Sequence, residues 1–150
     1  MKELIKVLKN KGFTLSCAES LTAGLFASTL CENAGVSAVF KGGVVTYCNE
    51  SKHQIIQVPQ YVIDDYGVVS SQCASFMARG VKKIFNTDIA ISFTGNAGPD
   101  VLEGKPVGLV YIGLCIGETT LSFECLFEGT RNEIRAQCVK EGIKKILELI

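Results

Sequence analysis

The sequence predicts an α/β fold, a three-layer α/β/α sandwich with one mixed, mostly parallel sheet. Three observations lead to this prediction. Strand-like and helix-like segments alternate along the 150 residues, which is typical of a sheet covered on both faces. Two strand-like runs meet at Gly117-Glu118, which indicates a hairpin and an antiparallel pair. Apolar residues make up 47% of the chain, enough for one core, so we expect a single domain over residues 1–150.

The first elements follow from apolar spacing. A helical stripe of leucine, isoleucine and valine over 3–11 can end at Gly12. We expect a strand at 13–18, a buried helix over the small apolar residues 21–33, and a second strand in the β-branched run 44–47.

The next elements follow from cap residues. Asn49 can cap a short helix, and another short helix is expected after Pro59. Ser70 or Ser71 can cap a longer helix that runs to about Phe85.

The second half of the chain has clearer signals. Residues 89–93 predict a strand and 94–106 a polar loop. The hairpin strands are expected at 108–116 and 119–127. Thr130-x-x-Glu133 has the spacing of a capping box and predicts a last helix to the C-terminus.

Composition excludes several classes of protein. The 15 Lys and Arg balance the 15 Asp and Glu, so no basic excess favours nucleic-acid binding. No apolar run reaches the ~18–20 residues of a membrane span, and the N-terminus lacks the features of a signal peptide. We therefore expect a cytoplasmic protein without nucleic-acid or membrane partners.

The seven cysteines are dispersed, and no Cys-x-x-Cys spacing occurs. With a single histidine, His53, the usual ligand spacings of zinc are absent, and we expect no metal site. Most cysteines lie in apolar stretches, which indicates reduced, buried thiols.

The first candidate site segment is 19–24, at a strand-to-helix junction. Ligands of open α/β sheets gather beyond the carboxyl ends of strands, and free N–H groups at a helix start suit an oxyanion or a phosphate. The alternative is that Ser20 or Thr22 only caps the helix.

The second segment is 42–52. The pair Gly42-Gly43 allows a ligand or another strand to approach closely, and Lys52 follows the strand end by a few residues. The alternative is a surface lysine. His53 is adjacent, so the two side chains do not share a helix face.

The third segment is 94–99, where small residues can admit a phosphate or a ribose; a plain turn is the alternative. Arg131 and Arg135 lie one turn apart on the last helix and could grip an anion. A solvated face or an intersubunit salt bridge would explain them equally well.

Taken in order, several blocks resemble the CinA C-terminal domain family. They are Ala18-Glu19-Ser20-Leu21-Thr22, Phe40 to Tyr47, Asn49-Glu50, Lys52, Gly67-Val68-Val69-Ser70, Thr94 to Pro99 and Lys105-Pro106-Val107-Gly108. The resemblance implies a nicotinamide-nucleotide amidase, which hydrolyses nicotinamide mononucleotide to nicotinic acid mononucleotide and ammonia in pyridine-nucleotide salvage.

The resemblance also implies roles for residues. Ser20 is the expected nucleophile, Lys52 its base, and Tyr47 assists. N–H groups at the start of the 21–33 helix would hold the oxyanion. No metal or cofactor is implied, the partner is a small-molecule nucleotide, and a homo-oligomer is expected. The substrate-binding residues it implies are Thr22, Gly42, Gly43, Thr46, Thr94, Gly95 and Arg131.

The sequence departs from the family pattern at four places. Ala23 stands where glycine is usual, Cys48 replaces serine, Asn96 occupies a normally apolar position, and the loop 100–104 is short. Two alternatives therefore stay open beside the amidase. One is a weak or inactive relative that acts as a nucleotide-binding or interaction module, and the other is a serine hydrolase with His53 as base.

Overall fold

The computed structural model describes all residues 1–150, and its elements alternate as the sequence predicts. In chain order they are α1 (Lys2–Lys11), β1 (Leu15–Glu19), α2 (Leu25–Cys31), the 3-10 helix η1 (Val36–Ala38), β2 (Phe40–Val45), α3 (Asn49–Gln54), α4 (Gln60–Tyr66), α5 (Ser71–Phe85), β3 (Ile89–Gly95), β4 (Leu109–Ile116), β5 (Thr119–Leu126) and α6 (Arg131–Leu149).

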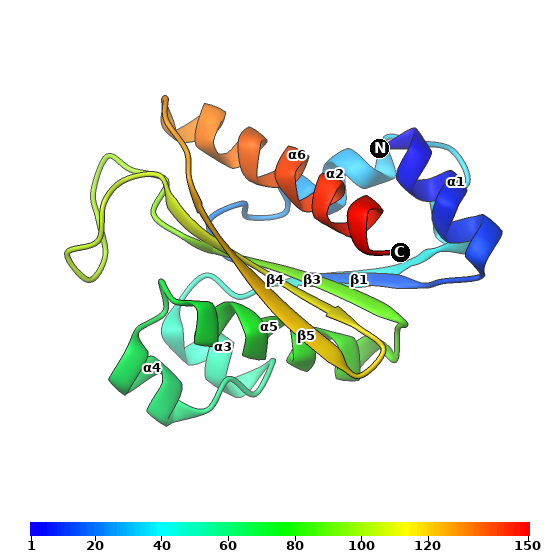
Figure 1. Cartoon of the computed structure of the whole chain (residues 1–150). Coiled ribbons are helices and arrows are strands. Elements are labelled where there is room, and N and C mark those ends of the chain that lie inside the picture. The colour runs from blue at the N-terminus through cyan, green and yellow to red at the C-terminus, as the bar shows by residue number, and fades with distance from the viewer.

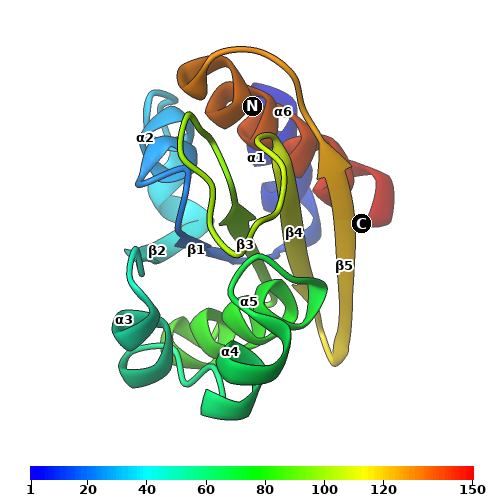
Figure 2. The same cartoon turned by 90° about the vertical axis from the view of Figure 1, so that its left-hand side faces the viewer.

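The five strands form one mixed sheet in the order β2-β1-β3-β4-β5. β1 pairs in parallel with both β2 and β3, and the β3–β4 and β4–β5 pairs are antiparallel. Only β4 therefore opposes the direction of the other four strands. The carboxyl ends of β1, β2 and β3 meet at one edge of the sheet, and Figure 2 looks onto this edge.

Helices cover both faces of the sheet, so the three-layer α/β/α prediction is confirmed. Figure 1 shows α1, α2 and α6 on one face and α3, α4 and α5 on the other. Each face has its own apolar core. Ile91 and Phe93 of β3 pack into the first core with Leu4, Phe26 and Ile134, whereas Ala90 lies in the second core with α5.

Several predicted helix ends are confirmed. Gly12 ends α1 in the left-handed region at φ 68°. Ser70 caps α5 by accepting a 3.1 Å bond from the Cys73 amide. At α6 the reciprocal box is present, because the Thr130 hydroxyl accepts from the Glu133 amide and the Glu133 carboxylate accepts from the Thr130 amide. Such caps satisfy amides that have no partner inside the helix.

Strand ends differ from the predictions by one or two residues at several places, and three boundaries need a larger correction. The second helix begins at Leu25, not at residue 21, because a turn over 20–24 precedes it. The second strand covers Phe40–Val45, not 44–47, because pairing with β1 extends through the two glycines. Asn49 is the first residue of α3, and Cys48 occupies the cap position without a side-chain bond to a backbone amide of the helix.

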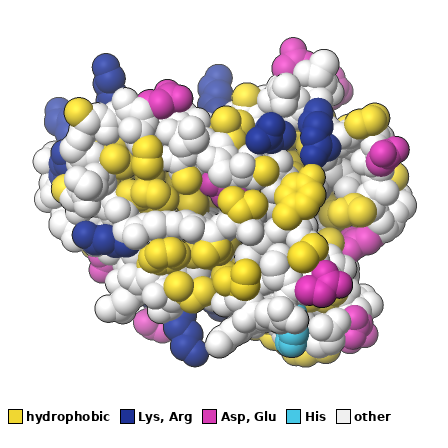
Figure 3. All heavy atoms as spheres, turned by 180° about the vertical axis from the view of Figure 1, so that it is seen from behind, with side chains coloured by type: hydrophobic (Ala, Val, Ile, Leu, Met, Phe, Trp, Pro, Cys, Tyr) yellow, Lys and Arg dark blue, Asp and Glu magenta, His cyan; other side chains and the backbone are white.

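All seven cysteines are free thiols, as predicted, and four of them are buried. No helix combines the length and the apolar character that crossing a membrane requires. β2 forms the rear edge of the sheet in the view of Figure 1, and Figure 3 shows hydrophobic side chains gathered in a band across that rear face. Val45 at the end of β2 and Tyr47 just beyond it are 50% and 58% exposed.

Candidate active site

A cavity of about 210 Å³ opens at the sheet edge where β1 and β3 end. Four of the predicted site residues line it: Ser20, Tyr47, Gly95 and Arg131. The remaining wall comes from Leu21 and from the loop that follows β3, between residues 96 and 102. The cavity therefore lies at the end of the sheet where open α/β folds place their ligands.

A serine–lysine contact lies at the Ser20 wall of this cavity. Ser20 follows β1 directly, and its amide donates a 3.0 Å bond to the Phe93 carbonyl of β3. Lys52 comes from α3 and is only 1% exposed. Its Nζ lies 3.0 Å from Ser20 Oγ. The two residues are 32 positions apart in the sequence, and the parallel pairing of β1 with β2 brings them together.

The other contacts of Lys52 are compatible with a neutral amine as well as with an ammonium. Nζ donates to the Thr46 carbonyl at 2.8 Å and to the Tyr47 carbonyl at 3.3 Å. A neutral amine has two N–H groups, and since carbonyl oxygens only accept, these two can hold both. The lone pair is then left to face the Ser20 hydroxyl. Burial lowers the pKa of Lys52 from its ordinary value, because desolvation penalises the charged form. A neutral amine in this position can accept a proton from a serine hydroxyl.

Glu19 explains why α2 begins late. Its carboxylate is 1% exposed and accepts three backbone bonds, each 3.0 Å long, from the amides of Gly24, Phe26 and Ala27. The negative charge of Glu19 therefore satisfies the free amides and the positive dipole end of α2, so the chain itself provides the anion at this helix start. The amides at the start of α2 itself are therefore not available to an oxyanion, and within the predicted 21–33 segment only the turn before α2 keeps free donors. The amides of Leu21 and Thr22, in the turn before the helix, donate to no group of the chain.

Tyr47 and Arg131 meet at the exposed rim of the cavity. Arg131 Nη2 donates to the Tyr47 hydroxyl at 3.0 Å, and Nη1 donates to the Gly98 carbonyl at 2.6 Å. The Tyr47 hydroxyl thus contacts Arg131, while its carbonyl supports Lys52. Arg131 ties together the ends of two strands and leaves a cation at the mouth of the site.

The three predicted threonines are buried beside the site and do not line the cavity. Thr94 Oγ1 donates to the Val68 carbonyl at 2.6 Å. The hydroxyls of Thr22 and Thr46 are fully buried and have no hydrogen-bond partner. Unpaired buried hydroxyls are uncommon in folded proteins. Thr22 closely follows Ser20 in the sequence, and the Thr46 carbonyl accepts from Lys52.

Gly42 and Gly43 also lie outside the cavity wall. A side chain at Gly42 would meet the Phe85 ring of α5, and one at Gly43 would meet Cys17 of β1. The glycines therefore allow neighbouring elements of the protein to approach closely. Of the two alternatives for this pair, the structure supports close packing of a strand rather than contact with a ligand.

His53 is separate from the nucleophile. Its Nδ1 lies 2.9 Å from the Val58 carbonyl, and the residue is not part of the cavity wall. Lys52 is the basic side chain in contact with Ser20. The structure therefore brings a lysine, and not the histidine, into contact with Ser20.

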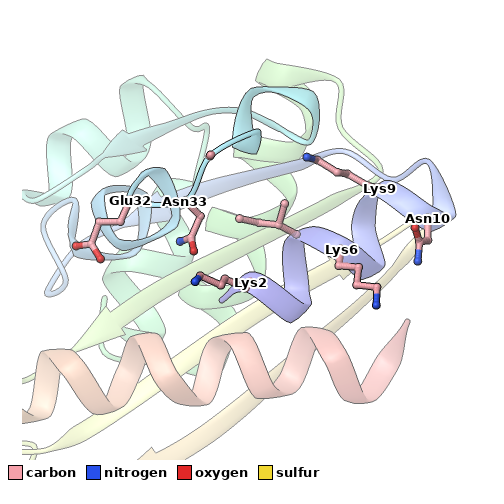
Figure 4. Close-up of a pocket in the computed structure, with 8 residues that line it drawn as sticks. Lys2, Lys6, Lys9, Asn10, Glu32 and Asn33 are labelled. Atoms are coloured by element: carbon pink, nitrogen blue, oxygen red, sulfur yellow. The ribbon is translucent and has the colours of Figure 1, made fainter.

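A larger surface cavity, of about 580 Å³, lies elsewhere between α1 and the end of α2. Figure 4 shows its lysines, Lys2, Lys6 and Lys9, along α1, with Glu32 and Asn33 opposite. This cavity has no nucleophile paired with a base. We therefore locate the candidate chemistry in the smaller cavity at the strand ends.

Comparison with known proteins identifies the family. The family model for the CinA C-terminal domain matches residues 1–150. The chain belongs to the CinA C-terminal domain family. Competence-damage inducible proteins of Bacillus cytotoxicus and Bacillus mycoides are each 51% identical to it over 150 residues. These matches cover 97% of this chain but 36% of the relatives, so the chain spans about a third of their length.

Solved structures of CinA-type proteins have the same fold. Competence damage-inducible protein A of Klebsiella pneumoniae superposes with a TM-score of 0.97 at 31% identity, over 99% of this chain and 92% of that chain. A competence/damage inducible protein of Agrobacterium tumefaciens gives 0.94 at 34% identity, over 99% and 92% of the two chains.

Asn96, one of the departures from the usual CinA pattern, fastens the loop 100–104. Its side-chain amide donates to the carbonyls of Leu102 and Lys105 at 3.1 and 3.0 Å, and its oxygen accepts from the Leu102 amide at 3.0 Å. Glu103 in turn accepts from the amides of Val68 and Val69. The short loop is therefore held in place by polar bonds on both sides.

Replacing Asn96 by alanine is expected to lower the free energy of unfolding by about 2–3 kcal/mol, because Leu102 and Lys105 would lose their partners in a part-buried place. Denaturant unfolding measures this, and amide exchange at Leu102 should accelerate. Replacing the exposed Asn10 by alanine is the control and should change stability by less than about 0.5 kcal/mol. Equal stability of both variants would contradict the fastening role.

Ala23, a second departure from the CinA pattern, adopts φ 47°, the left-handed region in which a Cβ is strained. The residue is exposed, so removing its methyl group leaves no cavity. Replacing Ala23 by glycine should raise the free energy of unfolding by about 0.5–1 kcal/mol, net of the extra backbone entropy of glycine.

Thermal unfolding checks this prediction, with replacement of Ala136 by glycine as the control. Ala136 is also exposed but lies inside α6, where glycine should cost about 1 kcal/mol. Stability changes of the same sign in the two variants would show that residue 23 carries no such strain.

Proposed function

We propose that this CinA-type chain hydrolyses the carboxamide of nicotinamide mononucleotide, giving nicotinic acid mononucleotide and ammonia. The observation that carries the proposal is the 3.0 Å contact between Ser20 Oγ and a buried Lys52 Nζ at the strand ends. The sequence resemblance supports the choice of substrate, whereas the names of the relatives say only that they are competence-damage inducible.

In the proposed reaction Ser20 Oγ attacks the carboxamide carbon while its proton passes to Lys52 Nζ. A tetrahedral intermediate forms, and the Lys52 ammonium then gives its proton to the departing nitrogen, which leaves as ammonia. A water molecule attacks the resulting ester after giving a proton to Lys52. Collapse releases the acid, and the proton returns to Ser20 Oγ.

The charges of the cavity fit a nucleotide that has a pyridinium ring and a phosphate. Arg131 supplies a guanidinium at the exposed rim, which suits the phosphate. Asp100 lines the same cavity and offers a carboxylate to the cationic ring. The ring's positive charge would also favour the neutral form of Lys52 once the substrate is bound.

The test is incubation of the purified chain with nicotinamide mononucleotide, with ammonia and nicotinic acid mononucleotide measured together. Equal amounts of the two products support the proposal. If the nucleotide raises the melting temperature, as a ligand of the folded state must, but no ammonia appears above background, the cavity binds nucleotides without catalysis and the proposal is wrong.

The proposal includes association of the chain with copies of itself, which the family resemblance implies. The hydrophobic band on the rear face (Figure 3) is a surface that such an assembly could cover. Light scattering of the purified chain at several concentrations gives the mass of the particle in solution, and a constant monomer mass would contradict this part of the proposal.

A further inference from the structure

The turn that carries Ser20 is held from two sides. At the end of the turn that leads into α2, the Glu19 carboxylate accepts from the amides of Gly24, Phe26 and Ala27. On the side of α6, Arg135 Nε donates to the Leu21 carbonyl at 3.1 Å. Arg135 Nη2 donates to the Thr22 carbonyl at 2.8 Å. These bonds link residues more than 110 positions apart in the chain.

The bonds of Arg135 fix the direction of a peptide group. The carbonyl of Leu21 and the amide of Thr22 belong to one planar trans unit, in which C=O and N–H point in opposite directions. With the carbonyl drawn toward Arg135, the Thr22 amide must point away from α6. The Ser20 carbonyl accepts from the Ala23 amide at 3.1 Å, which in the same way directs the Leu21 amide out of the turn.

Two backbone donors are therefore oriented directly after the nucleophile. The amides of Leu21 and Thr22 donate to no group of the chain, and Leu21 lines the cavity beside Ser20. The Ser20 amide cannot serve, because it is bonded to the Phe93 carbonyl. The amides at the start of α2 are held by Glu19. These two amides are the donors left beside Ser20 for a developing negative oxygen.

We propose that the amides of Leu21 and Thr22 form the oxyanion hole and that Arg135 is the positioning residue that orients it. The inference rests on the proposed amide hydrolysis and adds to it the group that stabilises the tetrahedral intermediate. Preoriented backbone donors need no rearrangement as charge develops on the oxygen.

Arg135 differs in this respect from Arg131, its neighbour one helical turn away. Arg131 lines the cavity and is exposed, whereas Arg135 is half-buried and does not line it. All three nitrogens of Arg135 are engaged, since Nη1 donates to Asn132 Oδ1 at 3.2 Å. The guanidinium of Arg135 therefore has no nitrogen left for a substrate, and Arg135 acts on catalysis through the turn that it holds.

The test compares Arg135→Lys and Arg135→Ala with the wild type in two assays. The first measures kcat and KM for nicotinamide mononucleotide. The second measures the rate at which an alkyl fluorophosphonate labels Ser20: the Oγ–P bond forms, fluoride leaves, the serine proton passes to Lys52, and the phosphonyl oxygen occupies the oxyanion position. Arg79→Ala is the matched control, because Arg79 is a side-chain-bonded arginine on α5.

We expect both Arg135 variants to lower kcat by about 10- to 100-fold, somewhat less than the ~10²–10³-fold of deleting a direct donor. KM should stay within about threefold, labelling of Ser20 should slow in parallel, and Arg79→Ala should match the wild type. If Arg135→Ala does not fold, Arg135→Lys decides, since an ammonium keeps the charge but not the two-pronged geometry.

Two outcomes would overturn the inference. A rise in KM with kcat unchanged would mean that Arg135 binds the substrate itself. Unchanged labelling in a folded variant would mean that the turn needs no such support. A wild type that is labelled at Ser20 but leaves nicotinamide mononucleotide intact would refute the proposed substrate alone, and the labelling rates would still decide the role of Arg135.

Discussion

Replacing Ser20 by alanine is expected to lower ammonia release from nicotinamide mononucleotide by about 10⁴-fold or more, because a nucleophile and its base act as one unit in serine enzymes. The fold should survive. The Ser20 hydroxyl has one hydrogen-bond contact, with Lys52, and the residue's backbone bond to Phe93 does not involve the side chain. The measurement is the initial rate of ammonia release together with the melting temperature.

The control for this variant is Ser16→Ala, which removes a hydroxyl from β1, the strand that Ser20 follows. Ser16 Oγ lies 2.8 Å from Thr87 Oγ1, inside the protein, so its loss should cost about 1 kcal/mol of stability and leave turnover near wild type. A Ser20→Ala variant with a tenth of the wild-type rate would place the chemistry on another group.

Replacing Lys52 by alanine is expected to lower turnover by about 10³-fold or more, since general-base help alone contributes ~10²–10⁴-fold. Wild-type turnover should rise with pH as Lys52 loses its proton. The rise should be complete below the ordinary lysine pKa, because burial lowers the pKa of Lys52. The Lys52→Ala variant should lack this rise, which a pH series of initial rates would show.

The lowered pKa of Lys52 also makes the stability of the fold depend on pH. The unfolded state holds the lysine proton more tightly than the folded state, so the free energy of unfolding should increase as pH rises from the folded pKa toward the unfolded one. Lys41→Ala, at an exposed position of β2, is the control and should keep the wild-type dependence of both stability and turnover on pH. A Lys52→Ala variant whose turnover still rose with pH as the wild type's does would exclude lysine as the base.

Local patterns in the sequence predicted most of the fold. Thr130-x-x-Glu133 gives the start of α6 because a capping box uses only neighbouring atoms. The start of α2 was not predictable in this way, since it depends on Glu19 turning its carboxylate back onto three amides. In the sequence, Glu19 is simply a polar residue after a strand.

The site was predicted less fully than the fold. Ser20 and Lys52 could be named because both follow strands, and the resemblance joined them; their contact depends on β1 and β2 pairing with Glu19 opposite Val45. Gly42 and Gly43 suited either a ligand or a close strand, and only the packing of Phe85 and Cys17 separates these alternatives.

Arg135 shows what spacing on one helix cannot reveal. The sequence indicated two arginines on one side of the last helix, free to hold an anion. Instead the guanidinium of Arg135 reaches carbonyls in the Ser20 turn, and only Arg131 lines the cavity. The role of each arginine depends on which loop lies beside it in three dimensions.

Trapping with hydroxylamine tests the Ser20–Lys52 chemistry most directly. An ester between Ser20 and the substrate's acyl group can be attacked by hydroxylamine in place of water. The wild type should then convert nicotinamide mononucleotide partly to the hydroxamate and partly to the acid, with ammonia equal to their sum, and Ser20→Ala should form neither. Hydroxamate and acid formed at the wild-type rate by Ser20→Ala would contradict the account.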